Sequence, residues 1–280
     1  MKLFINSPPF FHFLMTEQAR RYRIAFSTIE LLVAVVIFSV LATALATLVN
    51  SALNIWSKNE KQTSLEQRAR NITYLMTRDL QQALTTPFKF SNRGPQMLIN
   101  SEHLAGVALG NHLFFQAPIA TSRTKSDLAV VGYFIRKGGD DGNTYQLCRL
   151  FLNSDEPGYP APEADATQWL TPALLDQKAY PAASNYYQGL VAEDVPGLWI
   201  RIYQDDTELT SYDSRANGNV LPSHLNVSLA LLDLEGAQRL KAGQFNLPDP
   251  NLSKDALDYQ SQLPEQARRH VKIIMFNILY

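Results

Sequence analysis

Apolar residues dominate one stretch near the start of the chain. From Leu31 to Ser57 no residue carries a formal charge, and only scattered Ser, Thr and Asn interrupt the apolar side chains on every helical face. This stretch of about 27 residues exceeds the roughly 20 that a helix needs to cross the hydrocarbon core of a bilayer. The pattern predicts a membrane-spanning helix over residues 26–56.

After this stretch the pattern becomes amphipathic. Apolar residues recur at spacings of three and four, and no Gly or Pro occurs between Phe26 and Thr86. Pro87 disfavours helix at the residue before it. We expect one helix of about 55 to 60 residues, whose second part, residues 57–86, packs one face on a globular domain. The predicted buried stripe is Leu65, Ala69, Ile72, Met76, Leu80 and Leu84, and charged residues, including Arg78 and Asp79, are expected on the other faces.

Beyond Pro87 the pattern is typical of strands and turns, which predicts a β-rich domain over residues 87–280. Two strands on either side of the Gly-rich segment 137–143 form an expected antiparallel hairpin. Residues 153–190 are expected to be a long loop with one short helix near 172–177, and residues 237–264 a polar loop. The last strand of the chain is expected to close the sheet. The predicted strands are 113–115, 127–135, 145–152, 198–203, 225–234 and 270–280.

One carboxylate interrupts the apolar helix. Glu30 lies at its start, followed by Leu31, Leu32 and Val33. An unpaired carboxylate drawn into hydrocarbon costs a few kcal/mol, roughly 3 on insertion scales. Either Glu30 is solvated in the headgroup layer, or it has a cationic partner that arrives on assembly.

The residues around Glu30 carry a resemblance to a known family. Phe-Ser-Thr-Ile-Glu-Leu-Leu-Val-Ala, residues 26–34, resembles the processing and methylation motif of type IV pilins and type II secretion pseudopilins. The resemblance implies that a prepilin peptidase cuts between Ala25 and Phe26 and that the new amine is methylated. It also implies that Glu30 pairs with the Phe26 amine of a neighbouring subunit. Ala25 stands where the family prefers Gly, and its methyl group is expected to slow cleavage.

A second resemblance lies in the C-terminal half. The segments 195–203 and 221–229 resemble the corresponding part of J-type minor pseudopilins. Together the two resemblances imply an α+β, pilin-like fold, in which a long N-terminal helix packs on an antiparallel β-sheet domain. They also imply a tip or initiating subunit of a type II secretion pseudopilus or a type IV pilus.

The segment before the apolar helix reads as a leader. Arg20, Arg21 and Arg23 precede the helix, and the positive-inside rule places this end in the cytoplasm. Residues 1–25 are therefore expected to be a cytoplasmic leader, and the domain to lie in the periplasm behind a single inner-membrane span. Met1 and Met15 both remain possible starts.

Composition excludes several other classes of function. The formal net charge of -1 gives no electrostatic footprint for nucleic acid. The only cysteine, Cys148, reads as a buried small hydrophobe. The five histidines form no metal motif, and no nucleotide-binding loop or Ser-nucleophile elbow occurs. The pair Asp140-Asp141 reads as a solvated turn, with a calcium site as the open alternative.

Assembly rather than catalysis is the function that these observations favour. We expect no catalytic residue, metal or cofactor. The expected partners are other pilin-type subunits, the prepilin peptidase and the inner membrane. A signal-anchored periplasmic enzyme or ligand-binding domain, with the helix as a tether, is the competing hypothesis. A DNA-uptake pseudopilus is a third, which a basic tract would favour, and none stands out.

Overall fold

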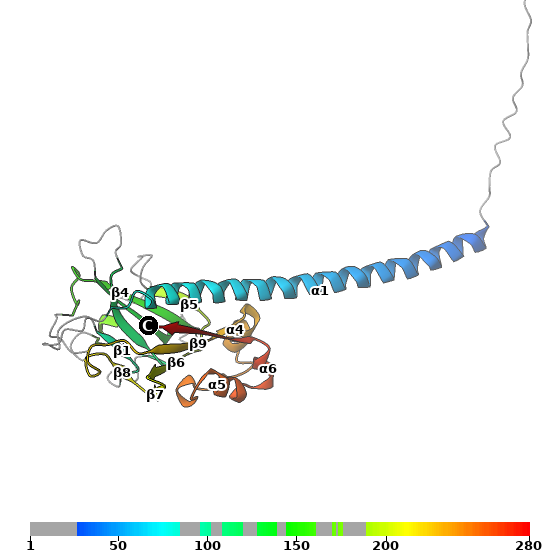
Figure 1. Cartoon of the computed structure of the whole chain (residues 1–280). Helices are drawn as coiled ribbons and strands as arrows, with labels where there is room; N and C mark the ends of the chain where they lie inside the picture. Colours follow the sequence, from blue (N-terminus) through cyan, green and yellow to red (C-terminus); the bar gives the residue numbers. More distant parts are fainter. Residues whose placement is uncertain are drawn as a thin grey trace, which may run out of the picture. The chain divides into compact units, whose positions relative to one another are not determined.

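A computed structural model describes residues 27–84, 96–101, 108–119, 128–138, 144–160, 170–171, 173–175 and 189–280. The described chain begins with the long helix α1 (Thr28–Leu80), and antiparallel strands and short helices follow (Figure 1). The α+β class predicted from the sequence is confirmed. The chain divides into two compact units, Met1–Trp56 and Ser57–Tyr280.

Helix α1 is continuous over 53 residues, roughly 80 Å at the usual rise per residue. Within its apolar part, hydroxyl groups donate to backbone carbonyls of the preceding turn, from Ser39 to Val35 O (2.7 Å) and from Thr43 to Ser39 O (2.8 Å). These bonds satisfy the Ser39 and Thr43 hydroxyl groups within the helix itself. The prediction of a single long helix is confirmed.

Six strands form the first sheet, in the order β5-β4-β3-β2-β1-β8, and all neighbours are antiparallel. The predicted hairpin is confirmed: β3 and β4 pair over ten residues, from Ala129↔Asn153 to Gly138↔Thr144. Asp140 and Asp141 lie outside the described residues. The strands are β1 (Met97–Ile99), β2 (Leu113–Ala117), β3 (Ala129–Gly138), β4 (Thr144–Asn153), β5 (Gly189–Glu193) and β8 (Tyr212–Asp213).

Four strands form a second antiparallel sheet, in the order β10-β9-β6-β7. The predicted C-terminal strand is confirmed and lies at one edge, where it pairs with β9, but the domain has two sheets where one was expected. Asp205 and Asp206, with φ of 47° and 65°, make the two-residue turn between β6 and β7. The strands are β6 (Gly197–Gln204), β7 (Thr207–Leu209), β9 (His224–Leu232) and β10 (Val271–Leu279).

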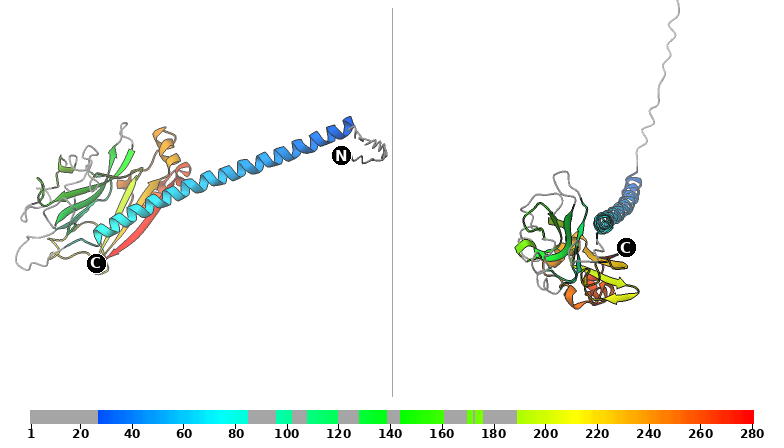
Figure 2. Two further views of the ribbon diagram at one scale, coloured as in Figure 1. Left: turned by 90° about the horizontal axis from the view of Figure 1, so that it is seen from above. Right: turned by 60° about the vertical axis from the view of Figure 1, so that its left-hand side comes forward.

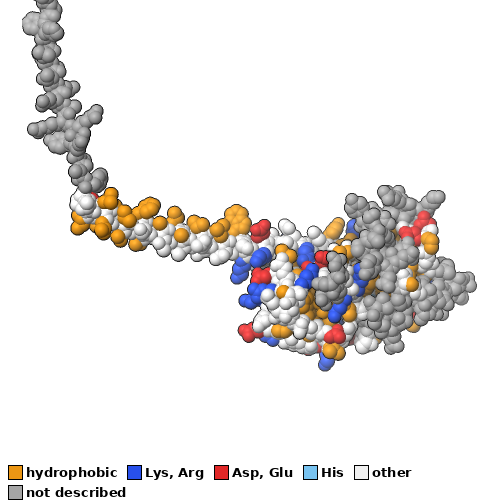
Figure 3. All heavy atoms as spheres, turned by 180° about the vertical axis from the view of Figure 1, so that it is seen from behind, with side chains coloured by type: hydrophobic (Ala, Val, Ile, Leu, Met, Phe, Trp, Pro, Cys, Tyr) orange, Lys and Arg blue, Asp and Glu red, His pale blue; other side chains and the backbone are white. Residues whose placement is uncertain are grey.

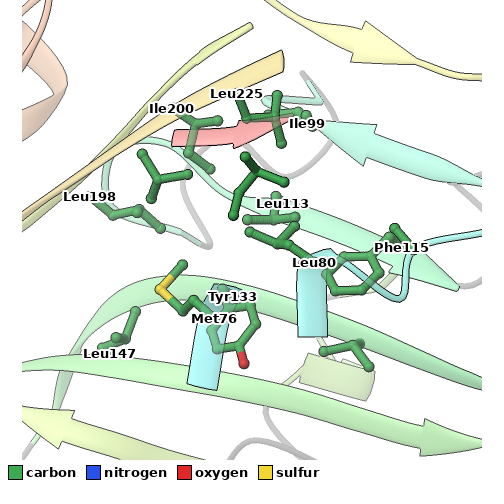
Figure 4. Close-up of a cluster of buried hydrophobic side chains, with 14 of the residues drawn as sticks. Met76, Leu80, Ile99, Leu113, Phe115, Tyr133, Leu147, Leu198, Ile200 and Leu225 are labelled. Atoms are coloured by element: carbon green, nitrogen blue, oxygen red, sulfur yellow. The ribbon is translucent and has the colours of Figure 1, made fainter. Parts of the chain in front are cut away.

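The main core lies where α1 and both sheets meet. Met76 and Leu80 of α1 are fully buried and point among side chains of the two sheets, such as Leu113 and Leu225 (Figure 4). The predicted stripe is confirmed at its centre, since Ala69 and Ile72 are also buried and Leu65 packs against the same core. Residues of α1 thus complete the hydrophobic core, so the domain needs this part of the helix to fold.

The expected polar loop at residues 237–264 is wrong. It contains helical segments, and aspartates begin three of them: Asp233 accepts from Gly236 N, Asp249 accepts from Asn251 N, and Asp255 accepts from Leu257 N and Asp258 N. These segments cover the second face of the four-stranded sheet, where Tyr259 packs on Trp199 with ring centroids 4.9 Å apart. The segments are α4 (Leu234–Lys241), the 3-10 turn η2 (Pro250–Leu252), α5 (Ala256–Gln262) and α6 (Glu265–Arg268).

The expected loop at 153–190 lies largely outside the described residues. Residues 154–160 form turns, and residues 173–175 are helical, within the range expected for one short helix.

Cys148 is predicted to be inert in the native state. The side chain is fully buried behind the six-stranded sheet, and burial raises the pKa of its thiol to about 11. Because the thiolate is the reactive form, iodoacetamide at pH 8 should leave the folded chain unmodified. Intact-mass measurement should show one adduct only after guanidinium unfolding, and an adduct on the folded chain would contradict the prediction.

Candidate functional site

The N-terminal part of α1 is an exposed apolar surface. Every described residue from Ser27 to Ser64 is exposed, including large side chains such as Phe38 and Trp56, each 72% exposed. Among the described residues this is the one helix long and apolar enough to cross a membrane. Figure 3 shows apolar side chains along the visible face of this helix, with other side chains and backbone between them. An exposed apolar surface of this size marks a site of contact with lipid or with other protein chains.

Glu30 is the only charged residue between Thr28 and Ser57. It lies in the first turn of α1, where the helix dipole favours a carboxylate. The turn is closed by the Leu31 N–H, which donates to Ser27 O (3.1 Å), and no cation among the described residues lies within ion-pair distance of Glu30. Ala25 and Phe26 lie outside the described residues, so cleavage between them and pairing of the Phe26 amine stay predictions.

A polar segment, Ser57–Ser64, follows the apolar part of α1. It borders a groove of about 360 Å³ that also includes Arg68 and Asp233. Most charges there have partners within the protein: Lys61 pairs with Glu235 at 3.1 Å, and Arg68 donates to the Glu193 carbonyl. Asp233 caps α4 and lies 3.1 Å from His270. These contacts identify the groove as a joint between α1 and α4 rather than as a ligand site.

A buried ionic cluster fixes the end of α1 to the six-stranded sheet. Asp79 is fully buried, and Arg149 Nη2 and Nε lie 2.6 and 2.8 Å from its Oδ2 atom. The Tyr133 hydroxyl donates to the same oxygen at 2.6 Å, and Arg78 Nη2 lies 3.0 Å from Oδ1. Burial raises the pKa of Tyr133 well above its usual value, so the phenol keeps the proton that it donates.

The sequence prediction for Asp79 was therefore wrong. Asp79 follows Met76 by three residues and Ile72 by seven, which places it on the buried face of the helix. The sequence indicated burial of Asp79 through its position in the apolar stripe of the helix. It indicated a buried partner through Arg149, a charged residue within an apolar strand. Paired burial of opposite charges is the physical reason that both are tolerated there.

The described histidines are dispersed in three environments. His224 stacks on Tyr203 with ring centroids 4.3 Å apart, His112 is buried near Phe114, and His270 contacts Asp233. In the described part of the chain, no group of three His, Cys, Asp or Glu side chains could hold a metal ion. The candidate functional residues are therefore those of the exposed part of α1.

Comparisons with known proteins give a likeness in structure and none in sequence. No protein-family model and no curated protein matches the chain. Among solved structures, the chain is similar to the type IV-like pilin TTHA1219 from Thermus thermophilus, with a TM-score of 0.37 and 10% sequence identity. The likeness covers 77% of this chain and 95% of that protein.

Proposed function

We propose that this protein is a pilin-type subunit, most similar to a minor pseudopilin of the J group, that assembles through its N-terminal helix into a pseudopilus or pilus. The observation that carries the proposal is the exposed, uncharged helix surface with a single carboxylate at its start. Such a surface needs lipid before assembly and partner helices after it. The motif at residues 26–34 supports the same reading.

Glu30 acts in this proposal as a register marker. In a bundle of apolar helices the effective dielectric constant is low, and an unpaired carboxylate is strongly destabilising. The Phe26 amine of a neighbouring subunit, freed by cleavage after Ala25, supplies the opposite charge. A subunit placed one step out of register leaves both charges unpaired, so the pair selects the correct stagger.

The membrane arrangement follows from the leader and the span. Residues 1–25, with three arginines near their end, stay in the cytoplasm, and residues 26–56 cross the inner membrane once. The polar segment and the β-rich domain then lie in the periplasm. The role is structural, and the partners are other pilin-type subunits together with the prepilin peptidase.

Processing of the N-terminus tests the proposal directly. The membrane form should begin at Phe26 and carry one methyl group on its amine, whereas cells without prepilin peptidase should retain the leader. Intact mass and N-terminal sequencing of the purified chain measure both. Ala25→Gly, which restores the residue that the family prefers, should process faster in a pulse-chase experiment. A functional complex that retains residues 1–25 would rule out the proposal and leave a tethered domain.

A further inference from the structure

The C-terminal strand β10 has an open edge. Among the described residues it pairs with β9 on one side, and no strand pairs with its other side. The pairing with β9 is uninterrupted over nine residues, from Val271↔Leu232 to Leu279↔His224, without a bulge. The strand is thus long and regular, and half of its backbone groups are left for another partner.

Hydrogen bonds at both ends of β10 identify the outward-facing residues. Asp233 N donates to His270 O at 2.9 Å, and Tyr280 N donates to Ser223 O at 3.2 Å. Backbone groups of successive residues in a strand point to opposite sides, so the even-numbered residues bond to β9. The N–H and C=O groups of the odd-numbered residues, from Ile273 to Leu279, therefore point to the open edge.

The other sheet edges in the described chain are short or irregular, in contrast to β10. Strand β7 has three residues, and its Glu208 forms a bidentate pair with Arg201 (2.7 and 2.6 Å). Strand β8 has two residues, and the pairing of β5 with β4 contains a register shift. Strand β10 has no proline, and its one charged residue is Lys272. The short length or irregular pairing of the other edge strands hinders the addition of a further strand, and β10 has neither feature.

A groove of about 580 Å³ runs beside this edge, between α1 and β10. Figure 2 shows the two elements side by side. Tyr74 on the helix is 70% exposed, and Met275 and Leu279 on the strand are 59% and 78% exposed. The groove is lined by Glu66, Ala69, Arg70, Thr73, Tyr74 and Thr77 of α1 and by residues 272–275 of β10.

The groove lies beside the edge along which an added strand would run. A strand paired with β10 lies about 4.8 Å beyond it. One row of its side chains would meet Ala69, Thr73 and Thr77 of α1, and the other row would lie next to Met275 and Leu279. At one end of the groove Glu66 pairs with Lys272 (3.2 Å). Arg70 adds a second positive charge to the lining, so the groove carries one more cation than anions. The complementary segment is therefore extended, apolar toward α1, and acidic near Arg70.

We propose that β10 accepts an extended edge strand from the globular domain of a different pilin-type subunit. This inference rests on the proposed function, which requires the helices of neighbouring subunits to run parallel. Glu66 meets Lys272 near the start of β10, so this part of α1 runs in the same direction as the strand (Figure 2). A two-fold pairing of β10 with a second copy would set the two α1 segments antiparallel, which the parallel bundle excludes.

Site-specific cross-linking in native membranes tests the proposal. The photoreactive residue p-benzoylphenylalanine replaces Met275 in the full-length chain, and mass spectrometry identifies the cross-linked peptide. The expected product joins Met275 to a strand-forming segment of a second protein that itself has an N-terminal apolar helix. A cross-link to a second copy of this chain, to lipid alone, or to nothing would overturn the proposal.

Asn277 offers a matched pair of variants, because its backbone N–H points outward and its side chain is exposed. Asn277→Pro removes that N–H and should lower the cross-link yield about tenfold, since the partner carbonyl loses its donor. Asn277→Ala keeps the N–H and should change the yield less than about twofold. Thr73→Trp, which fills the groove from the helix and leaves β10 intact, should also lower the yield. Equal yields in all three variants would contradict strand addition.

A comparison with Glu30→Gln separates this inference from the proposed function. If Glu30→Gln abolishes co-purification of partners while Asn277→Pro leaves the cross-link unchanged, assembly through the helix stands and strand addition is wrong. If the cross-link survives in Glu30→Gln and still depends on Asn277, strand addition stands and the role of the helix charge is wrong.

Discussion

Chains carrying Glu30→Gln are expected to enter the inner membrane in normal amounts but to lose their partner subunits. Insertion depends on the apolar residues that follow, and removal of a charge at the membrane boundary makes it easier. Under the proposed function, assembly of the variant leaves the Phe26 amine of the neighbouring subunit without its counter-ion in a medium of low dielectric constant. Loss of one partner of a buried ion pair typically costs about 3 to 5 kcal/mol, which corresponds to a fall of at least a hundredfold in association.

Co-purification from detergent-solubilised membranes measures this effect, with membrane fractionation as the check on insertion. Glu60→Gln is the matched control, because Glu60 is an exposed carboxylate of the same helix in its polar segment. The control should retain its partners. If Glu30→Gln behaves as Glu60→Gln does, the carboxylate at residue 30 is solvated in the headgroup layer and has no role in register.

Asp79→Asn is expected to lower the free energy of unfolding of the domain by about 3 to 5 kcal/mol. The substitution leaves the guanidinium of Arg149, whose side chain is only 5% exposed, without its charged partner. The Tyr133 hydroxyl keeps an oxygen to donate to, so the loss comes chiefly from the uncompensated cation. Urea unfolding of the full-length chain in detergent, followed by tryptophan fluorescence, measures it.

Two controls separate charge pairing from packing in this cluster. Tyr133→Phe removes one hydrogen bond to Asp79 and should cost about 1 kcal/mol. The double variant Asp79→Leu with Arg149→Met removes both charges and should recover most of the stability lost in Asp79→Asn, as apolar replacements of buried pairs often do. If Asp79→Asn lowers the free energy of unfolding by less than about 1 kcal/mol, water must reach the Arg149 guanidinium once the Asp79 charge is gone.

The elements that could be predicted from the sequence are those with strong local signals. Helix α1 has no Gly or Pro and a regular apolar stripe, and the structure contains it as one helix. The hairpin β3-β4 combines β-branched strands with a Gly-rich connection, and its antiparallel pairing is confirmed. In both cases the pattern within one segment was sufficient.

The missed features depend on contacts between distant segments. Helices α4 and α5 have eight and seven residues, and their apolar side chains are too few to give a clear period against a polar background. Their capping aspartates were readable signals. The division into two sheets depends on which distant strands pair, and no local pattern encodes such pairings; β1 and β8, for example, pair across more than 110 residues.

The candidate site was accessible to sequence reasoning only in part. Glu30 was identified because a charge in an apolar run is conspicuous, and its place in the first turn of α1 follows directly. Asp79 was misplaced because it was read as one of many charges on an amphipathic helix, although its spacing from Met76 assigns it to the buried face. The partner of Glu30 belongs to another subunit under the proposed function, so a single chain cannot display it.

Strand β10 completes the four-stranded sheet from a late position in the sequence. It pairs with β9 over residues 271–279, and Ile278 lies in the core that α1 and both sheets share. Because the ribosome adds residues in order, β9 keeps an unpaired edge, and part of the core stays uncovered, until β10 has been synthesised. A chain interrupted before residue 271 would therefore expose a strand edge and apolar side chains, and we expect it to aggregate or to be degraded.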